Sequence, residues 1–157
     1  MKALQFLCAA ALVAASTALG AEAPDEAGIR FWRPAPATIR QHLGRPYVWG
    51  ACGLKSYDCS GFVWRVMLDN GVLLKRTTAR KFSMMLAPVS QGNRYRYGNI
   101  VFFDSFKHCG IVNGPGTFYH SQSSKGTNLS EFNPYWRGLI CGFRGVAAPV
   151  SPPSTEK

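Results

Sequence analysis

Acidic residues are scarce in this sequence of 157 residues, which has 8 Asp and Glu against 18 Lys and Arg. The formal net charge of +10 at pH 7 indicates an anionic partner or environment, such as nucleic acid, membrane headgroups or an acidic polymer. The length is enough for one compact domain and short for two. The sequence also contains no internal repeat.

Beyond residues 1–20 the sequence has no hydrophobic run long enough to cross a membrane. Residues 1–20 contain one lysine, a short apolar run and then small residues, with Ala18 and Gly20 just before Ala21. This pattern is typical of a secretory signal peptide. We therefore expect an exported protein, periplasmic or extracellular, without stable membrane insertion. Export makes nucleic acid an unexpected partner and leaves the anionic polymers of the cell envelope.

The sequence also lacks the paired ligand spacings of zinc sites, because it has no C-x2-C and no H-x3-H pair. His108 and Cys109 are the nearest candidate ligands, but neighbouring residues of a strand point to opposite faces. The spacing therefore argues against a metal site.

Removal of a signal peptide leaves four cysteines, an even number that favours disulfides in an oxidising compartment: Cys52, Cys59, Cys109 and Cys141. If Cys59 is instead a catalytic thiol, at most one pair can form among the other three. We expect that pair to be Cys109 with Cys141, because both fall on predicted strands, although spacing alone leaves the connectivity open.

Composition divides the rest of the chain into one domain and two flanks. Residues 21–38 mix alanine, proline and charge, and are expected to be a leader segment rather than core. Residues 148–157 form a polar, Pro-rich tail that we expect to be disordered. The domain is therefore expected at residues 39–147.

Helical patterns come first in this domain and strand patterns follow. Helices are predicted at residues 38–43, 59–70 and 78–86, the second with an apolar stripe and an Asn-Gly stop. Short runs between glycines predict strands at residues 99–103, 109–112, 117–121 and 139–146. Helices followed by an antiparallel sheet give an α+β fold.

The segment that starts the second helix combines a helix cap with a thiol. Asp58 is a favourable N-cap, which places Cys59 in the first turn. Free N–H groups and the helix dipole there favour an anion, so the pKa of the thiol should fall. A thiolate is a nucleophile, and the same N–H groups can receive the oxyanion of an attacked amide. Because the Asp58 carboxylate opposes the thiolate, a nearby imidazolium is also needed.

Two histidines, His108 and His120, flank a turn rich in glycine and proline. If residue numbers paired across this hairpin sum to 228, the two imidazoles face each other on one side, which requires a three- or five-residue loop. A two-residue loop at Gly114-Pro115 gives 229 and opposite faces, unless a bulge intervenes. A catalytic pair of Cys59 and His108, with His120 orienting the base, therefore predicts an even register.

Residue chemistry alone also fits structural roles for these side chains. A cysteine beside a glycine at a helix start can be simple packing or half of a disulfide, and a histidine on a strand is often structural. Both interpretations of Cys59 and His108 stay open on this ground.

Longer stretches of the sequence resemble the NlpC/P60 family of cysteine peptidases. The stretches are Gly44-Arg45-Pro46-Tyr47-Val48-Trp49-Gly50, Asp58-Cys59-Ser60-Gly61-Phe62-Val63, Gly98-Asn99-Ile100-Val101-Phe102-Phe103, His108-Cys109-Gly110-Ile111-Val112 and Phe118-Tyr119-His120. They follow the family's order, and a later Pro-Tyr-Trp segment also fits. The resemblance covers about residues 39–146.

This resemblance implies a papain-like α+β fold, in which the nucleophile's helix packs on the sheet that carries the base. By position it assigns the nucleophile, the general base and its orienting residue to Cys59, His108 and His120. It assigns pocket or oxyanion roles to Tyr47, Asp58 and Ser60. It implies no metal and no cofactor.

The activity implied by the resemblance is hydrolysis of amide bonds in peptidoglycan stem peptides, often between D-γ-glutamyl and a diamino acid. Peptidoglycan or its muropeptides would then be the partner, and an inhibitor or activator protein is a further candidate. Two alternatives stay open: an N-acetylmuramoyl-L-alanine amidase with the same thiol chemistry, and a non-catalytic envelope-binding protein with Cys59 held in a disulfide.

Overall fold

The structure is a computed structural model that describes residues 31–148. The expected signal peptide, residues 21–30 of the expected leader and residues 149–157 of the expected tail lie outside the described residues. Within them, in chain order, are α1 (Pro36–Arg40), α2 (Cys59–Asp69), α3 (Ala79–Met85), β1 (Ala87–Pro88), η1 (Gln91–Asn93), β2 (Ile100–Phe103), β3 (His108–Gly114), β4 (Thr117–Gln122), β5 (Gly126–Glu131), α4 (Pro134–Leu139) and β6 (Ile140–Gly145).

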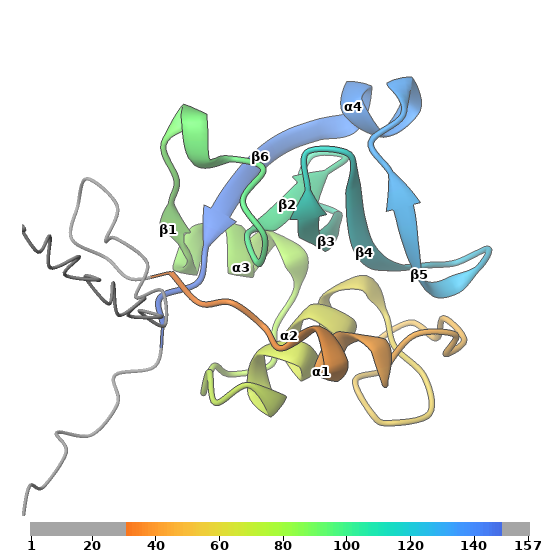
Figure 1. Ribbon diagram of the computed structural model, residues 1–157. Helices are drawn as coiled ribbons and strands as arrows, with labels where there is room; N and C mark the ends of the chain where they lie inside the picture. The colour runs from red at the N-terminus through yellow and green to blue at the C-terminus, as the bar shows by residue number, and fades with distance from the viewer. Residues whose placement is uncertain (1–30, 149–157) are drawn as a thin grey trace, which may run out of the picture.

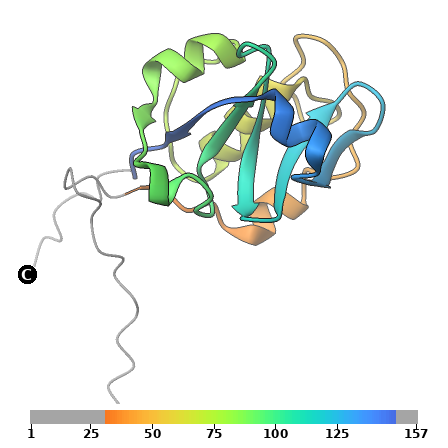
Figure 2. The same cartoon turned by 90° about the horizontal axis from the view of Figure 1, so that it is seen from above.

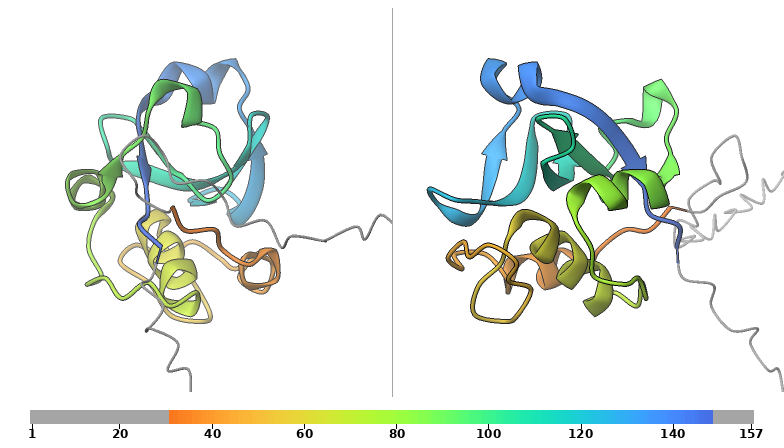
Figure 3. Two further views of the ribbon diagram at one scale, coloured as in Figure 1. Left: turned by 60° about the vertical axis from the view of Figure 1, so that its left-hand side comes forward. Right: turned by 180° about the vertical axis from the view of Figure 1, so that it is seen from behind.

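Six strands form one antiparallel sheet in the order β1-β6-β2-β3-β4-β5. Figure 1 shows α1 and α2 beneath this sheet, with α4 at its upper end beside β6. The strands lie over α2 when seen from above in Figure 2, and both views in Figure 3 keep α1 and α2 on the same side. The predicted α+β fold is confirmed.

Helix α2 begins at Cys59 and ends at Asp69, close to the predicted range. It starts where Asp58 adopts an extended conformation and its side chain accepts the N–H of Gly61 at 2.6 Å. Its apolar stripe is fully buried and consists of Phe62, Val63, Val66 and Met67. Each such side chain contributes roughly 1.5–3 kcal/mol by leaving water. The cap thus fixes the first turn, and hydrophobic burial holds the helix to the sheet.

The β3–β4 hairpin has the predicted even register, but through a different pairing. Gly110 lies opposite His120, so paired numbers sum to 230 rather than 228. The two-residue loop after Gly114 by itself gives an odd sum, and a bulge at Asn113 restores an even one. His120 is therefore diagonal to His108 on the same face of the sheet.

Two hydrophobic clusters cover the two faces of the sheet. One lies against α2 and includes Ile100, Phe102, Cys109 and Ile111. The other contains Val101, Phe103, Val112, Phe118, Phe132 and Phe143, with Trp136 of α4 packed against it. Because successive residues of a strand alternate between faces, His108 belongs to the second face and Cys109 to the α2 face.

The expected disulfide between Cys109 and Cys141 is wrong, because both cysteines are free. Strand β2 lies between their strands, so the two backbones are about 10 Å apart at ordinary strand spacing. A disulfide spans Cα atoms up to roughly 7 Å apart. Cys109 is also buried, whereas Cys141 is exposed.

Four elements of the described residues were missing from the sequence prediction, namely β1, η1, β5 and α4. β5 consists mostly of small and polar residues and has no clear strand period. It forms because each of its six residues pairs with a residue of β4. Its position next to β4 places it beside His120.

The packed part of the chain begins before residue 39. Trp32, which falls in the expected leader segment, is 4% exposed, and its backbone N–H donates to the carbonyl of Val146 at 2.7 Å. Phe31 pairs with Ala147 in an isolated bridge. The two ends of the described chain therefore lie side by side, as Figure 1 shows.

Gly61 allows the loop before α2 to pack directly on the first turn of the helix. A Cβ at this position would collide with the carbonyl oxygen of Ala51. That same oxygen accepts the N–H of Asp58 at 2.9 Å. The close approach therefore helps to hold the helix cap.

Replacing Gly61 by alanine should lower the free energy of unfolding by roughly 2 kcal/mol, because the new methyl group forces backbone against backbone. Gly53→Ala is the matched control, since nothing lies within 4 Å of a Cβ built there. Urea unfolding of the two variants measures the difference. Equal stabilities would contradict the close packing described above.

Candidate active site

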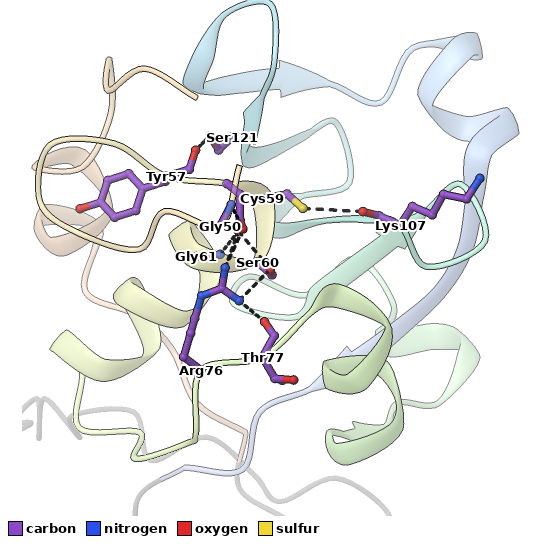
Figure 4. A network of polar contacts seen from close by, with 10 residues as sticks. Gly50, Tyr57, Cys59, Ser60, Gly61, Arg76, Thr77, Lys107 and Ser121 are labelled. Atoms are coloured by element: carbon purple, nitrogen blue, oxygen red, sulfur yellow. Dashed lines mark hydrogen bonds and ion pairs between the residues drawn. The ribbon is translucent and has the colours of Figure 1, made fainter. Parts of the chain in front are cut away.

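The thiol of Cys59 lies at the start of α2, beside the first residues of β3. Its side chain is buried, and Sγ lies 3.7 Å from the carbonyl oxygen of Lys107 (Figure 4). Hydrogen bonds from Cys109 and His108 lower the pKa of Cys59 to about 5, although burial and the Asp58 carboxylate act in the opposite direction. The thiolate is therefore the main form at neutral pH.

The imidazoles of His108 and His120 follow this thiol in a series of hydrogen-bond contacts. Nε2 of His108 is 2.8 Å from Nδ1 of His120, which leaves Nδ1 of His108 for Cys59. Nε2 of His120 is 2.9 Å from Oγ of Ser130 on β5. Burial, and then the neighbouring His108, lower the pKa of His120 to about 3, so His120 stays neutral. The three residues predicted to be catalytic thus lie together.

Aromatic rings hold the imidazoles on the second face of the sheet. Trp136 stacks on His108, with ring centres 5.5 Å apart and planes inclined by 27°. Trp136 also meets His120 edge-on at 5.0 Å, and Phe103 lies 5.9 Å from His108. Trp136 was not among the predicted site residues. Its only signal in the sequence was its place in the Pro-Tyr-Trp segment.

The Asp58 carboxylate accepts hydrogen bonds from several directions, and four of its partners, Gly50, Ser60, Gly61 and Arg76, are labelled in Figure 4. The N–H groups of Gly61 and Gly50 donate to it at 2.6 and 2.9 Å, and Oγ of Ser60 at 3.1 Å. Nη2 of Arg76 lies 2.8 and 2.7 Å from its two oxygens, and Nη1 donates to Ser60 at 3.1 Å. Arg76 thus offsets a negative charge next to the thiolate.

Arg76 was missed by sequence reasoning. It lies outside every stretch that resembles the NlpC/P60 family, in the segment between α2 and α3. No helical or strand spacing connects it to Asp58. Only the folded chain brings the guanidinium under the start of α2.

Tyr47 lies near the thiol, in the loop that precedes α2. Burial raises the pKa of its hydroxyl, and the negative charges of Cys59 and Asp58 raise it further. Tyr47 therefore keeps its proton and can donate a hydrogen bond. This is the property that an oxyanion donor needs.

Hollows open on both sides of the Cys59–His108 pair. The larger, of about 730 Å³, is lined by residues that include Tyr47, Asp104, His108, Gln122, Tyr135 and Trp136. The smaller, of about 280 Å³, is lined by residues that include Trp49, Asp58, Cys59, Ser60, Arg76 and Lys107. The six site residues predicted from the sequence therefore lie in or beside these hollows.

An unusual turn carries the chain into β3. Asp104, Ser105 and Phe106 have positive φ values of 47°, 51° and 66°. Each such residue costs about 1 kcal/mol relative to the right-handed region. Nη2 of Arg80 donates to the Ser105 carbonyl at 2.8 Å and stabilises the turn. The turn places the Lys107 carbonyl against the thiol.

Within residues 31–148, no group of three or more His, Cys, Asp or Glu side chains is placed to hold a metal ion. In the same range, no helix is long and apolar enough to cross a membrane. The reactive groups described at this site are the Cys59 thiol, the two imidazoles and the Tyr47 hydroxyl.

Alkylation by iodoacetamide should report the low pKa of Cys59. Because only the thiolate reacts, the rate should rise with pH through a midpoint near 5, and His108→Ala should raise this midpoint. Rates measured on Cys59→Ala correct for the other thiols. A midpoint near the ordinary 9.0 would contradict the assignment.

Since the folded pKa of Cys59 lies below its unfolded pKa, the stability contributed by the thiolate is present at high pH and is lost as the pH falls through about 5.

Arg76→Gln should raise the same midpoint, because the charge of Asp58 is then no longer offset. The double variant Arg76→Gln with Asp58→Asn removes both charges and should return the midpoint toward that of the unmodified protein. Iodoacetamide rates against pH again make the measurement. A double variant shifted at least as far as the single one would show that Arg76 acts through structure rather than charge.

The model of the NlpC/P60 family matches residues 44–145. The chain is 34% identical over 105 residues to the probable peptidoglycan endopeptidase LytE of Bacillus subtilis, which covers 64% of this chain and 30% of that protein. It is 32% identical over 111 residues to the peptidoglycan DL-endopeptidase CwlO of Bacillus licheniformis, which covers 64% of this chain and 25% of that protein. The chain thus spans less than a third of the length of these two relatives.

Among solved structures, an NLP/P60 family protein of Staphylococcus aureus described as similar to lipoprotein superposes with a TM-score of 0.63. The match covers 76% of this chain and 44% of that one, at 23% identity, so it shows a shared fold. The family model covers more than half of the chain and every predicted site residue from Tyr47 to His120. The chain belongs to the NlpC/P60 family.

Proposed function

We propose that this protein is an exported cysteine peptidase that hydrolyses amide bonds in peptidoglycan stem peptides, at the bond between D-γ-glutamyl and a diamino acid. The observation that carries the proposal is the thiol of Cys59, which has a pKa of about 5 and contacts the imidazole of His108. The neutral imidazole of His120 holds His108 in place. The names of LytE and CwlO support the substrate class. The pattern of residues 1–20 supports export.

In the proposed mechanism, the Cys59 thiolate attacks the carbonyl carbon of the scissile amide. The N–H groups at the start of α2 and the Tyr47 hydroxyl donate to the oxyanion that forms. Protonated His108 then gives its Nδ1 proton to the leaving amine, and a thioester on Cys59 remains. The first product leaves with its new amino group.

Hydrolysis of the thioester regenerates the site in the second half of the reaction. Neutral His108 takes a proton from water, and the resulting hydroxide equivalent attacks the thioester carbonyl. Breakdown of the tetrahedral intermediate releases the carboxylate product and the Cys59 thiolate. His120 stays neutral throughout and keeps His108 in orientation.

Defined muropeptides incubated with the purified protein should gain the mass of one water at the D-γ-glutamyl bond, as read by mass spectrometry. Cys59→Ala should lower the rate by a factor on the order of 10⁴ or more, because the nucleophile is lost. Cys141→Ser is the matched control, since it changes an exposed thiol on β6 and should leave turnover unchanged.

Other outcomes of this experiment would overturn specific parts of the proposal. Release of whole stem peptides from the glycan would identify an amidase instead of an endopeptidase. Cleavage that persists in Cys59→Ala would remove Cys59 as nucleophile. A fully reduced, folded protein that binds the fragments without cleaving them would favour a binding function.

A further inference from the structure

The hydrogen bonds behind the catalytic pair continue past His120 onto β5. Oγ of Ser130 lies 2.9 Å from Nε2 of His120 on one side and 2.9 Å from Oδ1 of Asn128 on the other. The side-chain amide of Asn128 donates to the carbonyl of Gly126 at 2.8 Å. One unbroken series of contacts therefore links a backbone carbonyl to His108.

The position of each proton along this series can be worked out from its far end. The Gly126 carbonyl can only accept, so the NH₂ group of Asn128 faces it and Oδ1 faces Ser130. Oδ1 can also only accept, so the single hydroxyl proton of Ser130 points to Asn128. Oγ of Ser130 is then an acceptor toward His120.

The same logic carries through the two imidazoles. His120 is neutral and holds one ring proton, which must lie on Nε2 because Ser130 accepts there. Its Nδ1 is then an acceptor, and Nε2 of His108 must donate to it. When His108 is neutral, its only proton is therefore on Nε2, and Nδ1 presents a lone pair toward Cys59.

We propose that Ser130 and Asn128 are positioning residues that fix the tautomers of both histidines, so that neutral His108 always presents an unprotonated Nδ1 to its reaction partners. This inference rests on the proposed function, because it concerns the general base of that reaction. The proton taken from water goes to Nδ1 and later leaves from the same atom. No proton travels along the series toward β5.

Removal of Asn128 tests this direction of hydrogen bonding. In Asn128→Ala the Ser130 hydroxyl is free to turn and donate to Nε2 of His120. The ring proton of His120 then moves to Nδ1 and is donated to Nε2 of His108. Neutral His108 must in turn carry its proton on Nδ1, which is the wrong tautomer for a base that acts through that atom.

The experiment compares full-length Ser130→Ala, Ser130→Thr and Asn128→Ala with the unmodified protein. Turnover of muropeptides should fall roughly 10- to 100-fold in both alanine variants. This is the size of effect seen when a group that orients a metal-binding histidine is removed, and Ser130 and Asn128 orient the general base in the same way. Ser130→Thr retains the hydroxyl on a strand position that tolerates threonine and should stay within about 2-fold of the unmodified protein. Melting temperatures identify any variant that fails to fold.

Imidazole ¹⁵N spectra provide a readout that a merely structural role would not change. They are recorded at alkaline pH on Cys59→Ala alone and on Cys59→Ala combined with each β5 change. Cys59→Ala alone and its combination with Ser130→Thr both keep the β5 hydroxyl, so both histidines should carry the proton on Nε2. Asn128→Ala should shift His120 and His108 toward the Nδ1–H form. These spectra need no turnover, so they stand even if the protein does not cleave peptidoglycan.

Two results would overturn the inference. One is full turnover in both alanine variants. The other is unchanged Nε2–H tautomers in Asn128→Ala, whatever its activity. If Ser130→Ala does not fold, the comparison of Ser130→Thr with Asn128→Ala gives the same decision.

Discussion

The Asp58 carboxylate is the group on which the geometry of this protein most depends. It accepts five hydrogen bonds, one each from Gly50, Ser60 and Gly61 and two from Arg76. Through them it joins the loop before α2, the first turn of that helix and the segment after it. Leaving such a buried carboxylate unpaired would cost several kcal/mol, so the three parts of the chain are held in one arrangement. The position of Cys59 follows directly from this arrangement, because Cys59 is the next residue along the chain.

The same carboxylate opposes the chemistry that it positions, since it raises the pKa of the adjacent thiol. Cys109 and His108 more than offset this effect by hydrogen bonding to Cys59, and Arg76 balances the charge from the other side. The two imidazoles differ in a related way. His120 is completely buried and stays neutral, whereas His108 lines an open hollow where it can exchange protons with substrate and water. The two histidines thus have different roles because their surroundings differ.

Local features of the site could be predicted from the sequence, because they depend on neighbours along the chain. The Asp58 cap and the apolar stripe of α2 are of this kind, whereas the even register of the hairpin followed only from the assumption that His108 and His120 act as a catalytic pair. The exact pairing could not be predicted, since the bulge at Asn113 has no clear sequence signal. The disulfide prediction failed because it depended on strand order, and β2 separates the two cysteines. Arg76 and Ser130 were missed because each joins the site only through tertiary contact. The catalytic roles themselves remain predictions.

The pairing of Phe31 with Ala147 determines how the described domain would respond to mechanical load. The N-terminal and C-terminal ends of the described chain lie side by side, next to the hydrogen bond between Trp32 and Val146. A force that pulls the two ends apart would therefore break these end contacts one after the other before it acted on α2 and β3. The thiol and the imidazoles lie on α2, β3 and β4, which take no part in these end contacts. Loss of the end contacts would therefore leave the reactive groups in register.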